Sequence, residues 1–308
     1  MPFFSVIIPL YNKENFIKNT LNSVFNQSFT DFEVIIVNDG STDTSEKKVL
    51  EFKDDRIRYF SKENEGVSTA RNYGIKEAKS EYITFIDADD YWYPDFLKEM
   101  HQTISLFPNQ KVFSAATEIE TSRNLIKAQY SIKKTGDHQI VNFFEASQRE
   151  PILWTSSIVI NLTVFEDVGY FDDELKIAED TDLWIRIGLK YSIVFIWKIL
   201  TIYRYDKNSI SRDASYFLQK KTYLKHYEEE KINLALKKYL DLNRFSEAIK
   251  HKITKNEVEF KSTKANIDLK LIIFRKRLLL SFPGIILKFL ILIKNRFADI
   301  GLSKSVFK

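Results

Sequence analysis

The sequence predicts an α/β protein with a mostly parallel central sheet flanked by helices and with a C-terminal helical extension. Short apolar, β-branched runs alternate with amphipathic helical patterns through the first hundred residues, which is typical of a doubly wound parallel sheet. Later in the chain, two long charged helical patterns over 216–240 and 245–266 contain neither Gly nor Pro. We therefore expect a first domain over 1–215 and a basic helical extension over 216–308.

The expected strands are apolar runs that stop at a turn or a polar residue. Pro9 ends the first run, and Asp39-Gly40 follows the second. The expected strands cover 4–9, 32–37, 56–60, 82–86, 112–117, 157–160, 192–197 and 200–205.

Helices are expected where apolar residues recur at helical spacing, as Ile17, Leu21 and Val24 do in the first of them. The expected helices of the first domain cover 14–26, 41–52, 66–78, 94–107 and 179–190. The polar stretch 121–150 is expected to form a loop or a lid over the site.

The formal net charge of +4 conceals an acidic part and a basic part. The extension over 216–308 holds 21 Lys and Arg against 9 Asp and Glu, whereas 1–215 holds 25 against 33. The two parts are therefore expected to meet different partners. The complete absence of cysteine excludes a disulfide framework, a cysteine nucleophile and a Cys-ligated zinc or iron–sulfur site.

Candidate functional residues follow the expected strands, at the edge where open parallel sheets bind ligands. Asp87-Ala88-Asp89-Asp90 offers hard oxygen ligands for Mg²⁺ or Mn²⁺, and the metal ion would in turn bind a diphosphate. The alternative is a solvated acidic turn before the helix at Pro94. Asp39 either accepts hydrogen bonds from a base or ribose or caps a helix.

Two further candidates lie on expected helices. Asp180, after Glu179, is either a general base or a carboxylate that favours a helix N-terminus. Arg71 either contacts a diphosphate through its planar fork of donors or is a surface arginine. The four histidines show no metal-ligand spacing.

Together, these motifs resemble those of the inverting family 2 glycosyltransferases with the GT-A fold, over roughly residues 3–215. Five motifs in the right order are far more specific than any one of them. They are Ser5-Val-Ile-Ile-Pro-Leu-Tyr-Asn12, Val37-Asn-Asp-Gly-Ser-Thr-Asp43, Glu63-Asn-Glu-Gly-Val-Ser-Thr-Ala-Arg-Asn72, Phe85-Ile-Asp-Ala-Asp-Asp90 and Glu179-Asp180 with Leu183-Trp184 and Arg186.

The resemblance implies a metal-dependent, inverting hexosyl- or N-acetylhexosaminyltransferase. Its donor would be a nucleotide diphosphate sugar, with a UDP-sugar expected, and its acceptor a hydroxyl of a glycan or lipid-linked molecule. The implied setting is the synthesis of bacterial cell-surface polysaccharide, lipopolysaccharide or capsule.

The resemblance also assigns roles to single residues. Asp180 is implied as the catalytic base and Asp89 as the ligand of Mn²⁺ or Mg²⁺. Asp206 stands where the family often has a histidine and is a second metal candidate, whereas Lys207 beside it could meet a phosphate. The implied nucleotide-sugar contacts are Pro9, Tyr11, Asp39, Arg71, Asp87 and Ala88, and those at the acceptor or the periphery of the site are Trp154, Glu179 and Trp184.

Alternatives remain for some of these roles. Trp154 and Trp184 could stack on a sugar ring or belong to the core, although Leu153-Trp-Thr-Ser-Ser157 occupies the place where the family shapes its acceptor pocket. The chain could also be a non-catalytic, membrane-associated nucleotide-sugar-binding protein. A sugar nucleotidyltransferase would usually show a Gly-rich loop after the first strand, and Pro9-Leu-Tyr-Asn-Lys13 is not such a loop.

The end of the extension carries an apolar run with a narrow basic stripe. The run 278–293 is about 24 Å long as a helix, short of a ~30 Å bilayer core, and Pro283 should kink or restart it. This pattern suits a helix in an anionic membrane interface, with a helical cap on the first domain and an oligomer interface as alternatives. The polar or small residues of the stripe are Lys270, Arg277, Ser281, Gly284, Lys288 and Asn295.

These features predict where the protein works. No basic residue precedes the apolar N-terminal run, so we expect no signal peptide. The expected location is the cytoplasm, with peripheral association at the inner face of the cell membrane. The apolar run beside the basic residues argues against nucleic acid as a partner, and the oligomeric state is left open.

Overall fold

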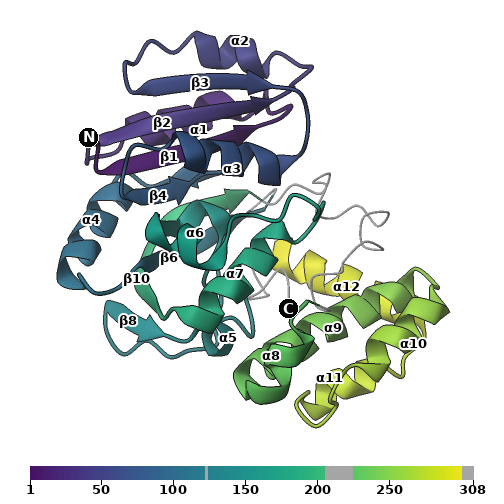
Figure 1. Ribbon diagram of the computed structural model, residues 1–308. Helices are drawn as coiled ribbons and strands as arrows, with labels where there is room; N and C mark the ends of the chain where they lie inside the picture. Colours follow the sequence, from purple (N-terminus) through teal and green to yellow (C-terminus); the bar gives the residue numbers. More distant parts are fainter. Residues whose placement is uncertain (122–123, 205–224, 300–308) are drawn as a thin grey trace.

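The computed structural model describes residues 1–121, 124–204 and 225–299. Within these ranges, ten strands form one central sheet with helices on both faces, and further helices extend from one side of it (Figure 1). The α/β fold and its C-terminal helical extension are therefore confirmed.

The sheet combines a parallel half with a mixed half. Its order is β3-β2-β1-β4-β9-β6-β10-β5, in which the first four strands are parallel and β9 runs antiparallel to both of its neighbours. Parallel pairing places the carboxyl ends of β1, β2 and β4 at one edge of the sheet. The strands are β1 (Phe4–Leu10), β2 (Phe32–Asp39), β3 (Ile57–Lys62), β4 (Tyr82–Phe85), β5 (Tyr91–Trp92), β6 (Val112–Glu120), β7 (Leu125–Lys127), β8 (His138–Val141), β9 (Ile158–Asn161) and β10 (Ile193–Arg204).

Alternate strand residues face two separate cores. Ile7 belongs to a core with α3, α6 and α7, whereas Val6 and Ile8 belong to a core with α1 and α4 on the opposite face. Gly74 brings α3 close to β1, because a Cβ at that position would collide with Ile7. The helices of the first domain are α1 (Ile17–Phe25), α2 (Ser45–Leu50), α3 (Val67–Glu77), α4 (Phe96–Leu106), α5 (Phe143–Ala146), α6 (Thr163–Val168) and α7 (Glu179–Lys190), with a 3₁₀ turn, η1 (Thr155–Ser157).

Two expectations about secondary structure are wrong. The stretch 121–150 is not simply a loop or a lid, because it carries β7, β8 and α5, and its residues Phe143 and Phe144 are fully buried. These aromatic side chains anchor the stretch to the sheet despite its polar average. The two strands expected at 192–197 and 200–205 are one strand, β10, with irregular register near Ile199.

The C-terminal helices share one core with the sheet and have another of their own. The first part of α9 joins the sheet core, where Tyr239 contacts Phe143 and Phe144 at ring-centroid distances of 5.2 and 5.8 Å. The expected boundary at 215/216 lies outside the described residues. Pro283 separates two helices, as expected. The helices are α8 (Tyr227–Ile232), α9 (Leu234–Ile253), α10 (Glu257–Ala265), α11 (Phe274–Leu279) and α12 (Gly284–Asp299).

Candidate active site

One buried arginine connects the two groups of candidate carboxylates. Arg71 of α3 is 4% exposed and donates hydrogen bonds to Asp87 Oδ1 at 2.7 Å and to Glu179 Oε1 at 2.9 Å. Its guanidinium also lies 5.2 Å from the ring centroid of Phe171. Arg71 is therefore not a surface arginine. Its Nη atoms bind carboxylates here, and the nucleotide-sugar contact that the resemblance implies for Arg71 stays a prediction.

The neighbouring asparagine fixes the loop that leads to α7. The Asn72 side-chain amide donates to the Phe171 carbonyl at 2.8 Å and accepts from the Phe171 amide at 3.0 Å. Ala178, the last residue before α7, has a left-handed φ of 63°, which is uncommon for a residue other than glycine. This paired contact and the left-handed residue together set the position of the first turn of α7.

Glu179 and Asp180 have different surroundings in this turn. Burial raises the pKa of Glu179 to about 7, and the charge of Asp180 adds to this effect while Arg71 opposes it. The Asp180 carboxylate accepts a hydrogen bond from the Thr181 amide at 2.5 Å and remains partly exposed. The Glu179 carboxylate is thus bound by Arg71, whereas the Asp180 carboxylate remains accessible to a group that enters from solvent.

A turn at the end of β4 carries the aspartates. Ser156 of η1 accepts a hydrogen bond from the Asp87 amide at 3.0 Å and donates one to Asp90 Oδ2 at 2.6 Å. The Arg204 amide donates to the other Asp90 oxygen at 3.0 Å. Burial, followed by the charges of Asp89 and Asp87, raises the pKa of Asp90 well above its ordinary value. Asp90 is therefore part of the support of the turn.

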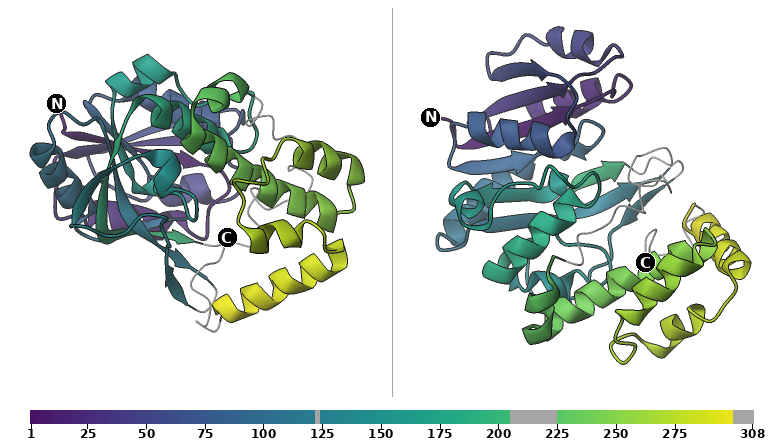
Figure 2. Two further views of the ribbon diagram at one scale, coloured as in Figure 1. Left: turned by 90° about the horizontal axis from the view of Figure 1, so that it is seen from below. Right: turned by 45° about the vertical axis from the view of Figure 1, so that its right-hand side comes forward.

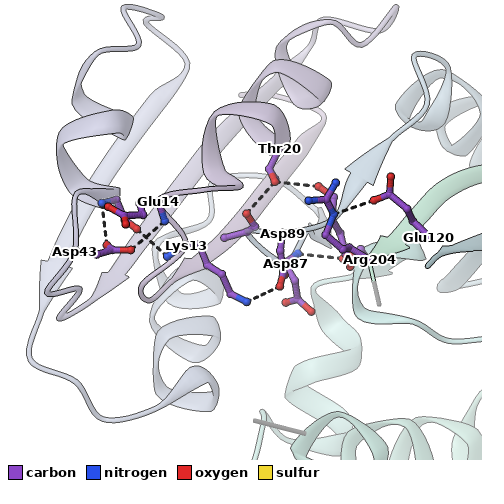
Figure 3. Close-up of polar contacts among 12 residues, drawn as sticks. Lys13, Glu14, Thr20, Asp43, Asp87, Asp89, Glu120 and Arg204 are labelled. Carbon is purple, nitrogen blue, oxygen red and sulfur yellow. Dashed lines mark hydrogen bonds and ion pairs between the residues drawn. The ribbon is translucent and has the colours of Figure 1, made fainter. Parts of the chain in front are cut away.

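The other residues of this turn point in different directions. Ala88 is buried, and its carbonyl accepts a hydrogen bond from Thr20 at 2.9 Å. The Asp87 side chain is 30% exposed and that of Asp89 is 17% exposed. Lys13, in the loop after β1, forms an ion pair with Asp89, in the turn after β4 (Figure 3). Asp87 and Asp89 are thus the aspartates whose side chains reach the surface.

This donor set fits a divalent cation only in part. Burial raises the pKa of Asp89, and the Lys13 charge opposes that rise. The described ranges contain no group of three or more His, Asp or Glu side chains that could hold a metal ion. Mg²⁺ often takes only one or two protein carboxylates and completes its shell with substrate phosphates and water. Asp89 meets that requirement, whereas Asp206 lies outside the described residues.

The residues expected around the nucleotide lie at the ends of β1 and β2. Pro9 is buried within β1, and the Tyr11 side chain just beyond it is 41% exposed. Asp39 accepts hydrogen bonds from Lys62 Nζ at 2.7 Å, from the Glu65 amide at 3.1 Å and from the Gly66 amide at 2.8 Å. Asp39 thus closes the loop before α3 and does not cap the helix that directly follows β2.

The two tryptophans differ in exposure. Trp184 is 2% exposed and packs edge-on against Phe171 at 6.1 Å, so its ring has no free face for a sugar in this structure. Trp154 is partly buried and lies 4.9 Å from the ring of Tyr203. The core interpretation therefore holds for Trp184.

Sequence reasoning gave no role to Ser156 or to the Lys13–Asp89 pair. Ser156 lies in the segment expected to shape the acceptor pocket, but a serine in a short turn has no pattern that reveals two long-range hydrogen bonds. Lys13 immediately follows the first motif, and its position there was the only available signal.

Known proteins resemble this chain in sequence and in fold. The sequence model of Glycosyl transferase family 2 matches residues 5–169, more than half of the chain. An uncharacterized glycosyltransferase of Rickettsia bellii is 31% identical over 259 residues, covering 79% of this chain and 36% of that protein. Glycosyltransferase GlyA of Streptococcus pneumoniae is 29% identical over 219 residues, covering 68% of this chain and 31% of that protein.

Solved structures show the same fold. Staphylococcus aureus TarS has a TM-score of 0.64 at 21% identity, covering 99% of this chain and 54% of that chain. TarS 1-349 in complex with UDP has a TM-score of 0.59 at 21% identity, covering 87% of this chain and 73% of that chain. The chain spans about a third of the length of each of the two curated relatives described above. From the family match, the motifs and the fold, we conclude that this chain belongs to glycosyl transferase family 2.

Proposed function

We propose that the chain transfers a sugar, with inversion, from a UDP-sugar to a hydroxyl of a glycan or lipid-linked acceptor. The observation that carries this proposal is the bridge from Asp87 through Arg71 to Glu179. It holds the expected donor side, at the end of β4, against the expected base, at the start of α7. In a single displacement, the attacking oxygen and the leaving group lie on opposite sides of the same carbon. The base side and the donor side of the site must therefore be held at a fixed separation.

The donor would lie along the carboxyl ends of β1, β2 and β4. TarS, which is similar in fold, has been solved with UDP and with UDP-GlcNAc, and this supports a UDP-linked donor. The exposed ring of Tyr11 offers a stacking face for the base. Both carboxylate oxygens of Asp39 already accept hydrogen bonds from the loop before α3, so a hydrogen bond from the base would have to share one of them. Asp87 would contact the ribose.

Asp89 would hold Mn²⁺ or Mg²⁺, which when bound would supply positive charge beside the departing diphosphate. Lys13 already places an ammonium group against Asp89 and would add to the positive charge near the phosphates. Arg71 Nε is buried and has no acceptor among the described residues, so it leaves one donor for a ligand that reaches this depth.

Asp180 would act as the base. Its carboxylate would take the proton of the acceptor hydroxyl, and the oxygen would attack the anomeric carbon opposite the departing UDP. The hydrogen bond between Glu179 and Arg71 fixes the backbone next to Asp180, and the Asp180 carboxylate stays partly exposed to an acceptor. Because both relatives and the TarS neighbour are bacterial, we propose cell-surface polysaccharide, lipopolysaccharide or capsule synthesis as the setting.

A donor screen tests this proposal. UDP release would be measured across UDP-sugars with Mn²⁺ or Mg²⁺, and products with lipid-linked acceptors would be identified by mass spectrometry. Asp180→Asn should retain UDP binding and lose transfer by about 100-fold or more. Asp173→Asn, the same change at an exposed position of the preceding loop, is the matched control and should remain active.

Two results would contradict the assignment. Transfer by Asp180→Asn at the control rate would remove Asp180 from the chemistry. If the protein bound UDP but transferred no sugar with any donor and acceptor tried, a non-catalytic binding protein would be favoured.

A further inference from the structure

Helices α11 and α12, with the residue that precedes α11, carry many exposed apolar side chains. We call this set the α11–α12 surface. Its members are 36% to 78% exposed. No helix in the described part of the chain is long and apolar enough to cross a membrane. The surface consists of Ile273, Phe274, Leu278, Ile285, Ile286, Phe289, Leu290, Ile291, Leu292 and Ile293.

The tertiary structure turns these side chains outward. Gly284 lets the start of α12 lie directly against α9, because a Cβ there would collide with the Lys252 carbonyl oxygen. Leu287 is 2% exposed and packs into the small core of the extension with Phe245 and Phe260. Both views of Figure 2 show α12 along the outer edge of the extension. This attachment fixes α12 in place while most of its apolar residues stay exposed.

The segment that carries the surface is also basic. The segment 269–298 contains no Asp or Glu. Burial lowers the pKa of Lys276 and of Lys294, so we count only the cations that are exposed. These are Lys270, Arg275, Arg277, Lys288 and Arg296.

We propose that the α11–α12 surface binds the anionic face of a lipid bilayer, with α12 lying in the interface. An exposed set of this size is unusual for a helix in water and needs a covering partner. A cap on the first domain does not account for it, because the side chains remain exposed in the folded chain. Pairing with a second copy would bring two acid-free, basic surfaces together, whereas anionic lipid complements their charge.

The position of α9 gives this binding a consequence for the site. The first part of α9 belongs to the sheet core and its second part to the core that holds α12. When α12 lies in the interface, the active site is therefore held at a fixed position and orientation relative to the bilayer. This favours an acceptor carried by a lipid. This last step rests on the proposed function, but the membrane binding itself does not.

Vesicle co-sedimentation of the full chain tests the proposal without any measurement of activity. Vesicles of phosphatidylcholine with phosphatidylglycerol would be compared with phosphatidylcholine alone, at low and high salt. We expect binding only with phosphatidylglycerol, weakened by salt. Phe289→Asp with Leu292→Asp should abolish it. Arg275→Gln and Lys288→Gln should each weaken it by about fivefold.

Matched controls lie on the neighbouring helix α10. Val258→Asp changes a side chain that is 77% exposed, and Lys261→Gln removes an exposed cation, so both should bind vesicles like the unchanged chain. Equal binding to both kinds of vesicle, or unchanged binding of the α12 variants, would overturn the proposal. So would a concentration-dependent dimer that Phe289→Asp disperses, because a second copy would then cover the surface. Loss of transfer activity with intact vesicle binding would contradict only the proposed function.

Discussion

Arg71 Nη1 lies 2.9 Å from Glu179 Oε1, a contact between residues 108 positions apart in the chain. The same guanidinium binds Asp87, so one side chain of α3 aligns the end of β4 with the start of α7. We therefore assign Arg71 a positioning role between the donor and acceptor sides.

Arg71→Gln should destabilise the protein and reduce transfer together. Without the guanidinium, two carboxylates lose their cation in a mostly buried setting, which should lower the free energy of unfolding by about 3 kcal/mol. Urea unfolding and UDP release measure the two effects. Arg58 is a suitable control, because it also bridges two carboxylates, Glu33 and Glu77, away from the site. Arg58→Gln should lower stability but leave turnover by the folded enzyme unchanged, and equal turnover losses in both variants would contradict the positioning role.

Glu179→Gln should change how stability depends on pH. The pKa of Glu179 is about 7 in the folded protein and 4.5 in its unperturbed state. Between these values the folded state holds a proton that the unfolded chain releases, so this group makes the free energy of unfolding fall as the pH rises. Urea unfolding across that window should show a flatter profile for Glu179→Gln. Glu145→Gln, at an exposed position, should follow the original profile, and an unchanged profile in Glu179→Gln would refute the role given to burial.

Asp89→Asn should remove the effect of metal on donor binding. The neutral amide is a poorer ligand for a hard cation, so the gain in UDP affinity on adding Mn²⁺ should shrink by about tenfold or more. Calorimetry with and without Mn²⁺ measures this gain. Asp95→Asn, just before α4 where the aspartate side chain is 43% exposed, is the control. If Asp89→Asn kept the full metal-dependent gain, the metal would have to bind elsewhere.

Ser156→Ala tests the support of the aspartate turn. The change removes the hydrogen bonds to the Asp87 amide and to Asp90 Oδ2 and should lower the free energy of unfolding by about 1–3 kcal/mol. UDP-sugar affinity should fall as well, since Asp87 and Asp89 share the turn. Ser28→Ala removes an exposed hydrogen bond to Asp95 and should have little effect on either quantity. A stable Ser156→Ala variant with normal donor affinity would show that the turn holds without Ser156.

Local patterns predicted most elements of the first domain and the places of its motifs. The helix at 179–190 and the buried strands β1, β2 and β4 were expected close to their observed bounds. Apolar periodicity and turn residues act within a few positions of one another, so one sequence is enough to reveal them. The antiparallel direction of β9 and the elements inside 121–150 escaped prediction, because strand direction and burial depend on distant partners.

The sequence by itself determined which residues could do chemistry, their order along the chain and the basic, apolar character of its last helices. Only the tertiary structure decided that Arg71 faces Glu179, that Asp39 closes the loop before α3, and that Trp184 lies in the core. It also decided that α12 attaches through Gly284 and Leu287 and leaves its other apolar residues exposed. The physical reason is that a side chain's partners are set by how helices pack on the sheet, and this packing joins positions that no local pattern connects.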